Sequence, residues 1–257
     1  MGRAIERAAE GVSDLAIVAR VDEDGAERLA EAGAKGASAG YERMPGASLK
    51  DAARAGDVVV EFSTPEGFRA VAAHCREARL PLVSGTTGLS PDDDRLLEAL
   101  AAAAPVLRAS NFSLGVIALR RALGAALASL PAGWDIEIVE RHHRGKADSP
   151  SGTALALARD ATRARGWGDD VLRHGREGRP GPRAEREIGM HSVRGGSWVG
   201  DHAVLLAGPG ESLELRHTAD DRLAFAHGAL AAARFVATAK PGRYALEDVL
   251  SPPGRAG

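Results

Sequence analysis

Short apolar runs alternate with amphipathic segments through the first half of the chain. The runs are rich in β-branched residues, as buried strands are. They are LAIVARVD (15–22), DVVVEF (57–62), PLVSGTTG (81–88) and PVLRASNF (105–112). The segments between them, AERLAEAG, GFRAVAAHCREAR and DDDRLLEALAAAA, have helical spacing. Strands and helices that alternate in this way predict a parallel sheet covered by helices, which is an α/β fold of the Rossmann-like class.

Small polar or turn-forming residues follow each predicted strand. They are Asp22-Glu23, Ser63-Thr64-Pro65, Gly85-Thr86-Thr87-Gly88 and Ser110-Asn111. In doubly wound sheets, ligands bind at the carboxyl ends of the strands. Any one of these loops could be a simple connection, but four in series favour a nucleotide-binding crevice.

The pattern changes after residue 113. One long helix is predicted over SLGVIALRRALGAALASL, ending before Pro131. The run WDIEIVE (134–140) alternates, which places Trp134, Ile136 and Ile138 on one face of a strand. A Gly/Arg/Pro-rich stretch at 173–183 then precedes three further strand candidates. These are REIGMHSV, DHAVLLAG and ESLELRHT, the last two joined by Gly208-Pro209-Gly210, a composition typical of hairpins.

The second half therefore predicts an α+β domain with a mixed or antiparallel sheet. The chain closes with a helix over RLAFAHGALAAARFVA, whose apolar surface can return to either domain. We expect a dinucleotide-binding domain made of residues 1–113 and 222–257, and a substrate-binding domain over residues 114–221.

Composition narrows the class of protein. The chain has 257 residues and a formal net charge of −2, so no basic excess indicates nucleic acid as a partner. The longest apolar stretch near mid-chain is broken by Arg120 and Arg121, which argues against a membrane span. The N-terminus lacks the apolar centre of a signal peptide. Cys75 is the single cysteine, which fits the reducing cytoplasm.

The N-terminus bears on cofactor binding. A dinucleotide fold opens with a strand and a glycine-rich loop that approaches the pyrophosphate. This chain begins Met1-Gly2-Arg3-Ala4-Ile5, which reads as the end of such a loop running into its helix. Asp22 ends a predicted strand twenty residues after Gly2, the usual offset of the acid that binds the adenosine ribose. We expect the first strand and two loop glycines to be encoded upstream of Met1, which reading the upstream DNA would test.

The segment ERHHRGKADSPSGT (140–153) is the strongest candidate for chemistry, although a solvated loop could have this composition. Adjacent side chains on an extended backbone point in opposite directions. His142 and His143 are therefore poor joint metal ligands, and with no carboxylate or cysteine at familiar spacing we expect no metal site. The two histidines can instead play different roles. Histidine, with an ordinary pKa of about 6.5, suits proton donation at cellular pH.

The rest of this segment favours an anion site. Of the 33 basic residues only four are lysines, so Lys146 stands out in an arginine-rich chain. Ser151, Gly152 and Thr153 open a strongly helical run. A Ser or Thr there could simply cap the helix. A helix N-terminus also offers backbone N–H groups to an anion. Lysine, helix N-terminus and hydroxyl together predict a site for a carboxylate.

The segment ERHHRGKADSPSGTALALA resembles the signature of the 4-hydroxy-tetrahydrodipicolinate (dihydrodipicolinate) reductase family, E-x-H-H-x-x-K-x-D-x-P-S-G-T-A. Other stretches are similar to that family in order and spacing. They are EFSTPEG, SGTTGLS, ASNFSLGV and the region from residue 189 to 229. The resemblance implies an NAD(P)H-dependent reduction in diaminopimelate and lysine biosynthesis. Hydride passes from the nicotinamide to a cyclic dicarboxylate derived from the 4-hydroxy precursor.

The resemblance also implies roles for particular residues. His142 would donate the proton, and Lys146 would bind and polarise the substrate. The carboxylates of the substrate would be held by His143, Ser151, Gly152 and Thr153. The cofactor would be bound by Met1, Gly2, Asp22, Gly85, Thr86, Thr87, Ser110, Asn111 and Phe112. The resemblance also implies a homotetramer built through the sheet of the second domain, which is the usual assembly of the family, so we expect the same of this chain.

Two points leave alternatives open: which nicotinamide cofactor is preferred, and which reaction, if any, the chain catalyses. Glu23 follows Asp22 where an arginine would favour a 2′-phosphate, so we expect NADH to be preferred to NADPH. One alternative is a related dehydrogenase that acts on another amino or imino acid. Another is a non-catalytic dicarboxylate-binding paralogue, which would bind pyridine-2,6-dicarboxylate but not NADH.

Overall fold

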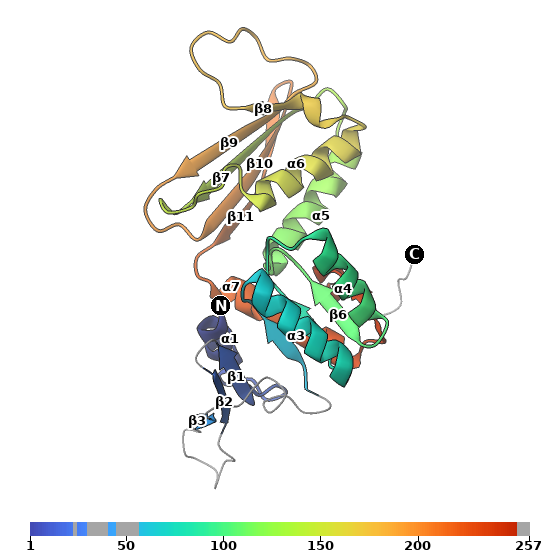
Figure 1. The fold of residues 1–257 in the computed structure, drawn as a ribbon. Coiled ribbons are helices and arrows are strands. Elements are labelled where there is room, and N and C mark those ends of the chain that lie inside the picture. The colour runs from blue at the N-terminus through green and yellow to red at the C-terminus, as the bar shows by residue number, and fades with distance from the viewer. Residues whose placement is uncertain (23–24, 30–40, 45–56, 251–257) are drawn as a thin grey trace. The chain divides into compact units, whose positions relative to one another are not determined.

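The computed structural model describes residues 1–22, 25–29, 41–44 and 57–250. It divides into two compact units, which Figure 1 shows. One unit contains Met1–Phe112 and Phe225–Gly257, and the other is Ser113–Ala224. No helix within the described ranges is long and apolar enough to cross a membrane.

The first unit contains a four-stranded, wholly parallel sheet, as an α/β fold requires. Its strand order is β12-β6-β5-β4. The strands are β4 (Val59–Glu61), β5 (Leu82–Ser84), β6 (Pro105–Arg108) and β12 (Gly242–Tyr244). The helices after the first two are α3 (Pro65–Ala78) and α4 (Pro91–Ala101), and the C-terminal helices are α7 (Leu223–Thr238) and α8 (Leu246–Val249). The predicted Rossmann-like class is confirmed.

Local sequence explains where α3 and α4 begin. The Thr64 hydroxyl accepts a hydrogen bond from the Gly67 N–H, and Ser90 caps α4 in the same way through Asp93. A proline occupies the first turn of each helix, where its missing N–H costs nothing. Both helices pack into a core of buried apolar side chains. This core contains Phe68, Ala72, Cys75, Leu80, Leu82, Leu97, Leu100, Ala101, Ala104 and Val106.

The N-terminal part of this unit differs from the prediction. A helix does begin at Gly2, as α1 (Gly2–Ala9). The expected parallel strand at 15–22 is wrong: only β1 (Ala19–Asp22) forms, and it pairs antiparallel with β2 (Gly25–Leu29). β3 (Tyr41–Met44) completes this separate sheet.

The helix expected over AERLAEAG is also wrong in its described part, because residues 26–29 belong to β2. Helix propensity differs by less than about 0.7 kcal/mol between ordinary residues, so pairing with a neighbouring strand overrides it. Residues 30–33 of that segment, and Glu23, lie outside the described residues.

The second unit is a five-stranded mixed sheet in the order β11-β10-β7-β9-β8. The strands are β7 (Asp135–His142), β8 (Leu172–His174), β9 (Ile188–Arg194), β10 (Gly200–Gly208) and β11 (Glu211–Ala219). The pairs β7–β9 and β8–β9 are parallel, and β10 pairs antiparallel with β7 and β11. A 3-10 turn, η1 (Asp169–Val171), precedes β8. Helices α5 (Leu114–Ser129) and α6 (Gly152–Arg165) lie together on one face of this sheet (Figure 1).

The alternation in β7 has the predicted consequence. Trp134, Ile136 and Ile138 are buried in one core with residues of α5 and α6. The hairpin predicted at residues 208–210 also forms: Gly208 pairs with Glu211, and Gly210 has a φ of +82°, which favours glycine. Gly189 of β9 matters too. A Cβ there would lie 1.7 Å from the Glu137 carboxylate, so only glycine leaves room for that side chain.

Candidate active site

The signature segment begins at one end of the mixed sheet. His142 is the last residue of β7, and α6 starts at Gly152 with Ser151 as its N-cap. The loop between them is held by the turn that follows β9. The His143 N–H donates to the Trp198 carbonyl at 2.8 Å, and the Gly195 N–H donates to the His142 carbonyl at 3.1 Å. The sheet therefore fixes both ends of the segment.

The two histidines have different surroundings, as extended backbone predicts. His142 is buried on the face covered by α5 and α6, whereas His143 is half-buried. His142 Nδ1 lies 2.5 Å from Glu140 Oε2. Gly200 leaves room beside the other ring nitrogen, because a Cβ there would lie 3.2 Å from His142 Nε2. The Nδ1 atom of His142 therefore makes its hydrogen bond within the protein.

Glu140 is the centre of a buried polar cluster. Its side chain is 1% exposed. Arg194 Nη1 donates to Oε2 and Nη2 to Oε1, each at 2.8 Å, and the Ser151 N–H donates to Oε1 at 3.1 Å. Burial alone would raise the pKa of Glu140, but hydrogen bonds from Arg194, His142 and Ser192 outweigh it and lower the pKa to about 2. The side chain is therefore a carboxylate at neutral pH.

Sequence reasoning missed Glu140 and Arg194. A signal was present, because Ile136, Ile138 and Glu140 share one face of the alternating strand. A charged residue in the apolar register of a strand needs a partner when it is buried. The alternation therefore indicated a buried carboxylate, but not which residue would neutralise it.

His202 of β10 is a second functional candidate that the sequence did not identify. Its Nε2 lies 3.0 Å from Ser151 Oγ, and its ring meets that of His142 edge-on, with centroids 5.1 Å apart. Burial, with a smaller contribution from His142, lowers the pKa of His202 to about 4, so the ring is neutral at pH 7. Its buried Nδ1 has no hydrogen-bond partner within the described part of the chain.

Lys146 pairs with a carboxylate of its own loop. Its Nζ lies 2.7 Å and 2.9 Å from the two carboxylate oxygens of Asp148. The Lys146 side chain is 20% exposed and that of Asp148 is 61% exposed. The hydrogen bond from Lys146 lowers the pKa of Asp148. Exposed pairs contribute about 0–1 kcal/mol, so a substrate carboxylate can replace Asp148 at little cost.

The start of α6 divides into an inner and an outer part. The Ser151 hydroxyl is buried, accepts from the Ala154 N–H at 3.2 Å and contacts His202. Gly152 is exposed and Thr153 half-buried, so they lie at the accessible side of the helix start. The first N–H groups of a helix have no intrahelical acceptor. The Ser151 hydroxyl thus has a structural partner, whereas Gly152 and Thr153 are on the more accessible side of the helix start.

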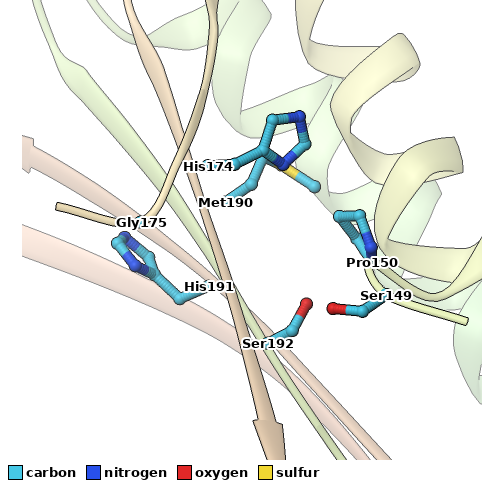
Figure 2. A pocket seen from close by; sticks show the side chains of 7 residues that line it. All are labelled: Ser149, Pro150, His174, Gly175, Met190, His191 and Ser192. Carbon is cyan, nitrogen blue, oxygen red and sulfur yellow. The ribbon is translucent and has the colours of Figure 1, made fainter. Parts of the chain in front are cut away.

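A pocket of about 570 Å³ opens beside the same segment, at the edge of the sheet (Figure 2). It is lined by Ser149, Pro150, His174, Gly175, Met190, His191 and Ser192. The hydroxyls of Ser149 and Ser192 face one another across it in Figure 2. Among the residues described, neither His142 nor Lys146 lines this pocket.

Six of the predicted cofactor residues follow the carboxyl ends of β5 and β6: Gly85, Thr86, Thr87, Ser110, Asn111 and Phe112. There Glu61 is a buried carboxylate that ties two strand ends together. Its Oε1 accepts from the Ser63 N–H and the Thr86 hydroxyl, both at 2.6 Å, and its Oε2 accepts from the Ser84 hydroxyl at 2.7 Å. Sequence analysis did not identify Glu61, although the run VVVEF has an acid at its end.

The three residues predicted to line the nicotinamide, Gly85, Thr86 and Thr87, have different surroundings. Thr86 is buried and its hydroxyl is bound to Glu61, whereas Thr87 is exposed. Gly85 packs against the Phe62 ring, where a Cβ would lie 2.0 Å from a ring carbon. Thr87 and the backbone of Gly85 and Thr86 are therefore the parts that can face a ligand.

The remaining predicted cofactor residues are more scattered. Ser110 and Asn111 follow β6, next to the Ala109 N–H that donates to the Ser84 carbonyl at 3.1 Å. Phe112 is buried with its ring 5.1 Å from that of Phe62, so it is a packing residue. Met1 caps α1, Gly2 is the first residue of that helix, and Asp22 ends β1 in the separate antiparallel sheet.

Comparison with known proteins agrees with this arrangement. Two family profiles match: "Dihydrodipicolinate reductase, N-terminus" over residues 1–112, and "Dihydrodipicolinate reductase, C-terminus" over residues 115–250. The 4-hydroxy-tetrahydrodipicolinate reductase of Rubrobacter xylanophilus is 44% identical over 98% of this chain and 94% of its own length. That of Nitrosomonas eutropha is 39% identical over 97% of this chain and 94% of its own.

A solved structure is also similar. The dipicolinate-bound dihydrodipicolinate reductase from Paenisporosarcina sp. TG-14 has a TM-score of 0.61 and 28% identity, over 76% of this chain and 74% of that one. The parallel sheet, the mixed sheet, the His-His-Lys segment and these matches lead to the same assignment. The chain belongs to the dihydrodipicolinate reductase family.

Proposed function

We propose that the chain reduces the cyclic dicarboxylate derived from 4-hydroxy-tetrahydrodipicolinate to tetrahydrodipicolinate, with His142 as the proton donor. Its family membership makes it an NAD(P)H-dependent reductase of diaminopimelate and lysine biosynthesis. The observation that carries the proposed role is the hydrogen bond of His142 Nδ1 to the buried Glu140 carboxylate. This bond makes Nδ1 the protonated nitrogen and leaves Nε2 to exchange a proton with the substrate.

The substrate side of the proposal uses the rest of the segment. Lys146 binds and polarises the substrate, exchanging its contact with Asp148 for one with the ligand. His143, Ser151, Gly152 and Thr153 form the carboxylate site. Support comes from the accessible start of α6, where backbone N–H groups favour an anion. Because the Ser151 hydroxyl is held by His202, its contribution is to shape the helix start and to offer its neighbours' N–H groups.

The cofactor side uses the strand ends of the parallel sheet, whose hydroxyls and glycines fit a nicotinamide nucleotide. When bound, the nicotinamide supplies the hydride. Gly85, Thr86 and Thr87 line its ring, and Ser110, Asn111 and Phe112 shape the neighbouring wall. Met1 and Gly2 at the start of α1 take the pyrophosphate, and Asp22 takes the ribose.

NADH is the preferred cofactor in this proposal. Asp22 and Glu23 are consecutive acids in the sequence, and two carboxylates repel the 2′-phosphate of NADPH. The assembly is a homotetramer formed through the sheet of the second unit. Val193, an exposed apolar side chain on the face of that sheet away from α5 and α6, is compatible with an interface there. The compartment is the cytoplasm, consistent with a single buried cysteine.

The test is a turnover assay on the purified chain, following NADH oxidation with substrate supplied by the preceding condensation step. We expect product formation with NADH, and a higher kcat/KM for NADH than for NADPH. Equal or NADPH-favouring values would contradict the cofactor preference. Turnover confined to another imino acid in a panel would favour a related dehydrogenase. Binding of pyridine-2,6-dicarboxylate without any binding of NADH would favour a non-catalytic paralogue.

A further inference from the structure

One arginine connects the two parts of the signature segment. Arg194 of β9 places Nη1 and Nη2 on the two oxygens of Glu140, each at 2.8 Å. The same Nη2 donates to the Asp148 carbonyl at 2.7 Å. Glu140 is hydrogen-bonded to His142, and the side-chain carboxylate of Asp148 accepts a hydrogen bond from Lys146. Arg194 therefore contacts both the group that orients His142 and the loop that presents Lys146.

We infer that Glu140 and Arg194 are positioning residues for the reduction: Glu140 fixes the tautomer and orientation of His142, and Arg194 holds Glu140 and the Lys146 loop in one register. The inference rests on the proposed role of His142 as proton donor. Glu140 does not face the substrate, because its side chain is 1% exposed and hydrogen-bonded to His142, Arg194 and the Ser151 N–H. Their effect is exerted through His142 and Lys146.

Strand pairing explains how precisely Glu140 is placed. It lies opposite His202 on β10 and opposite Ser192 on β9, so all three side chains are on the sheet face covered by α6. The Ser151 N–H approaches from the start of α6. A two-point contact with a guanidinium is directional as well as ionic, so the carboxylate cannot rotate about its axis. A carboxylate fixed at both oxygens in turn fixes the imidazole that donates to it.

The charges around this pair favour an ionised Glu140 and a protonated Nδ1. Arg194 from β9 is positive, and it faces Glu140 directly. His202 from β10 is neutral at pH 7, because burial lowers its pKa to about 4. The Ser151 N–H, at the N-cap of α6, donates to Glu140, and the Ser151 hydroxyl contacts His202. Arg141 pairs with Asp201 on the opposite sheet face. Glu140 is thus the anion in contact with the His142 ring.

The decisive variant is Glu140→Gln, compared with Glu137→Gln as a matched control. Glu137 lies on the same strand, binds arginine and histidine in the same manner, and points to the other face. We expect Glu140→Gln to lower kcat about 10- to 100-fold, the range for groups that orient a functional histidine. The loss should fall on kcat, with KM for the dicarboxylate changed much less, because Glu140 acts through His142 and not on the substrate. Binding of NADH and the kcat of Glu137→Gln stay as in the wild type.

Arg194 is tested separately because it has two functions. Arg194→Gln should lower kcat and also raise KM for the dicarboxylate, because both Glu140 and the Asp148 carbonyl lose a donor. Arg194→Lys keeps the charge but cannot make the two-point contact. It should therefore restore neither kcat nor KM fully to the wild-type value. A raised KM with unchanged kcat in Arg194→Gln would remove the link to His142.

The outcomes separate this inference from the proposed function. If His142→Gln keeps near-normal kcat, the proton-donor assignment fails. If His142→Gln is inactive but Glu140→Gln keeps wild-type kcat, the positioning role is wrong. Should Glu140→Gln not fold, ¹⁵N NMR of the wild-type imidazoles decides, with His142→Gln used for assignment. A proton on Nδ1 of His142 at neutral pH supports the inference, and a proton on Nε2 alone overturns it.

Discussion

Glu137 and Glu140 lie three residues apart on β7, and each binds a histidine and arginine, yet they lie on opposite faces of the sheet. Glu137 accepts from His191 at 2.6 Å, from Arg176 at 2.7 Å and 3.0 Å, and from Arg183 at 3.1 Å. Burial would raise the pKa of Glu137, but these hydrogen bonds lower it to about 2, as they do for Glu140. The chemistry of the two clusters is nearly the same.

Their surroundings differ. Glu137 is 24% exposed, and its arginines come from the long connection between β8 and β9, which Figure 1 shows as a wide loop. The Glu137 cluster therefore anchors that loop to the sheet. Glu140 is 1% exposed and is surrounded by β9, β10 and the start of α6. The same carboxylate–histidine–arginine set thus occurs twice on one strand, once partly exposed beside a loop and once buried beside the signature segment.

The largest expected effect contrasts the two histidines. His142→Gln should lower kcat by about 10²- to 10⁴-fold, because general acid catalysis is lost, and should change KM much less. His191→Gln removes the corresponding histidine of the Glu137 cluster and should leave kcat within a few-fold of wild type. Steady-state kinetics with NADH measures both. Equal losses of kcat in the two variants would show that His142 has no special role compared with His191.

Lys146→Ala should have the next largest effect, lowering kcat by about 10²-fold and raising KM for the dicarboxylate, since one charged donor to the developing anion is lost. Asp148→Asn is the matched control, because it removes the competing carboxylate but keeps the lysine. We expect its KM to be unchanged or lower. A higher KM in Asp148→Asn would show that Asp148 is needed to hold Lys146 in place.

Glu61 of β4 is a third glutamate to compare with Glu137 and Glu140. Its hydrogen bonds described above come from hydroxyls and a backbone N–H, and not from arginine or histidine. Glu61→Gln places an amide N–H₂ against those donors, which should cost about 1–3 kcal/mol of unfolding free energy. It should also raise KM for NADH several-fold, with KM for the dicarboxylate unchanged. Chemical denaturation and cofactor-dependent kinetics measure the two effects. A change in dicarboxylate KM alone would contradict the cofactor role of these strand ends.

The smallest expected effects are on the pH dependence of stability. The pKa of His202 is lowered to about 4 in the folded chain, so its protonation favours unfolding. Stability should fall as pH drops from about 6.5 towards 4, and His202→Gln should lose that slope. The pKa values of Glu137 and Glu140 are lowered to about 2, so their contribution is full above about 4.5 and is lost as pH falls towards 2. Urea melts across these two ranges separate the two classes of group.

Much of the fold could be predicted from the sequence. The alternation of apolar runs indicated the parallel sheet, and the alternation in 134–140 correctly placed Trp134, Ile136 and Ile138 in one core. The hairpin at 208–210 follows from local turn chemistry. Local signals of this kind depend on residues near in sequence. The antiparallel pairing of residues 19–22 with 25–28 was missed, because helix propensity is a weak preference that strand pairing overrides.

The sequence by itself determined the family signature and the different surroundings of His142 and His143, because both depend on residues adjacent along the chain. Only the tertiary structure decided which distant groups contact this segment. Arg194 lies 54 residues from Glu140, and His202 lies 51 residues from Ser151. Strands β9 and β10 bring them together on either side of β7. Neutralising a buried carboxylate requires a partner in space, and no spacing along the chain specifies which residue that is.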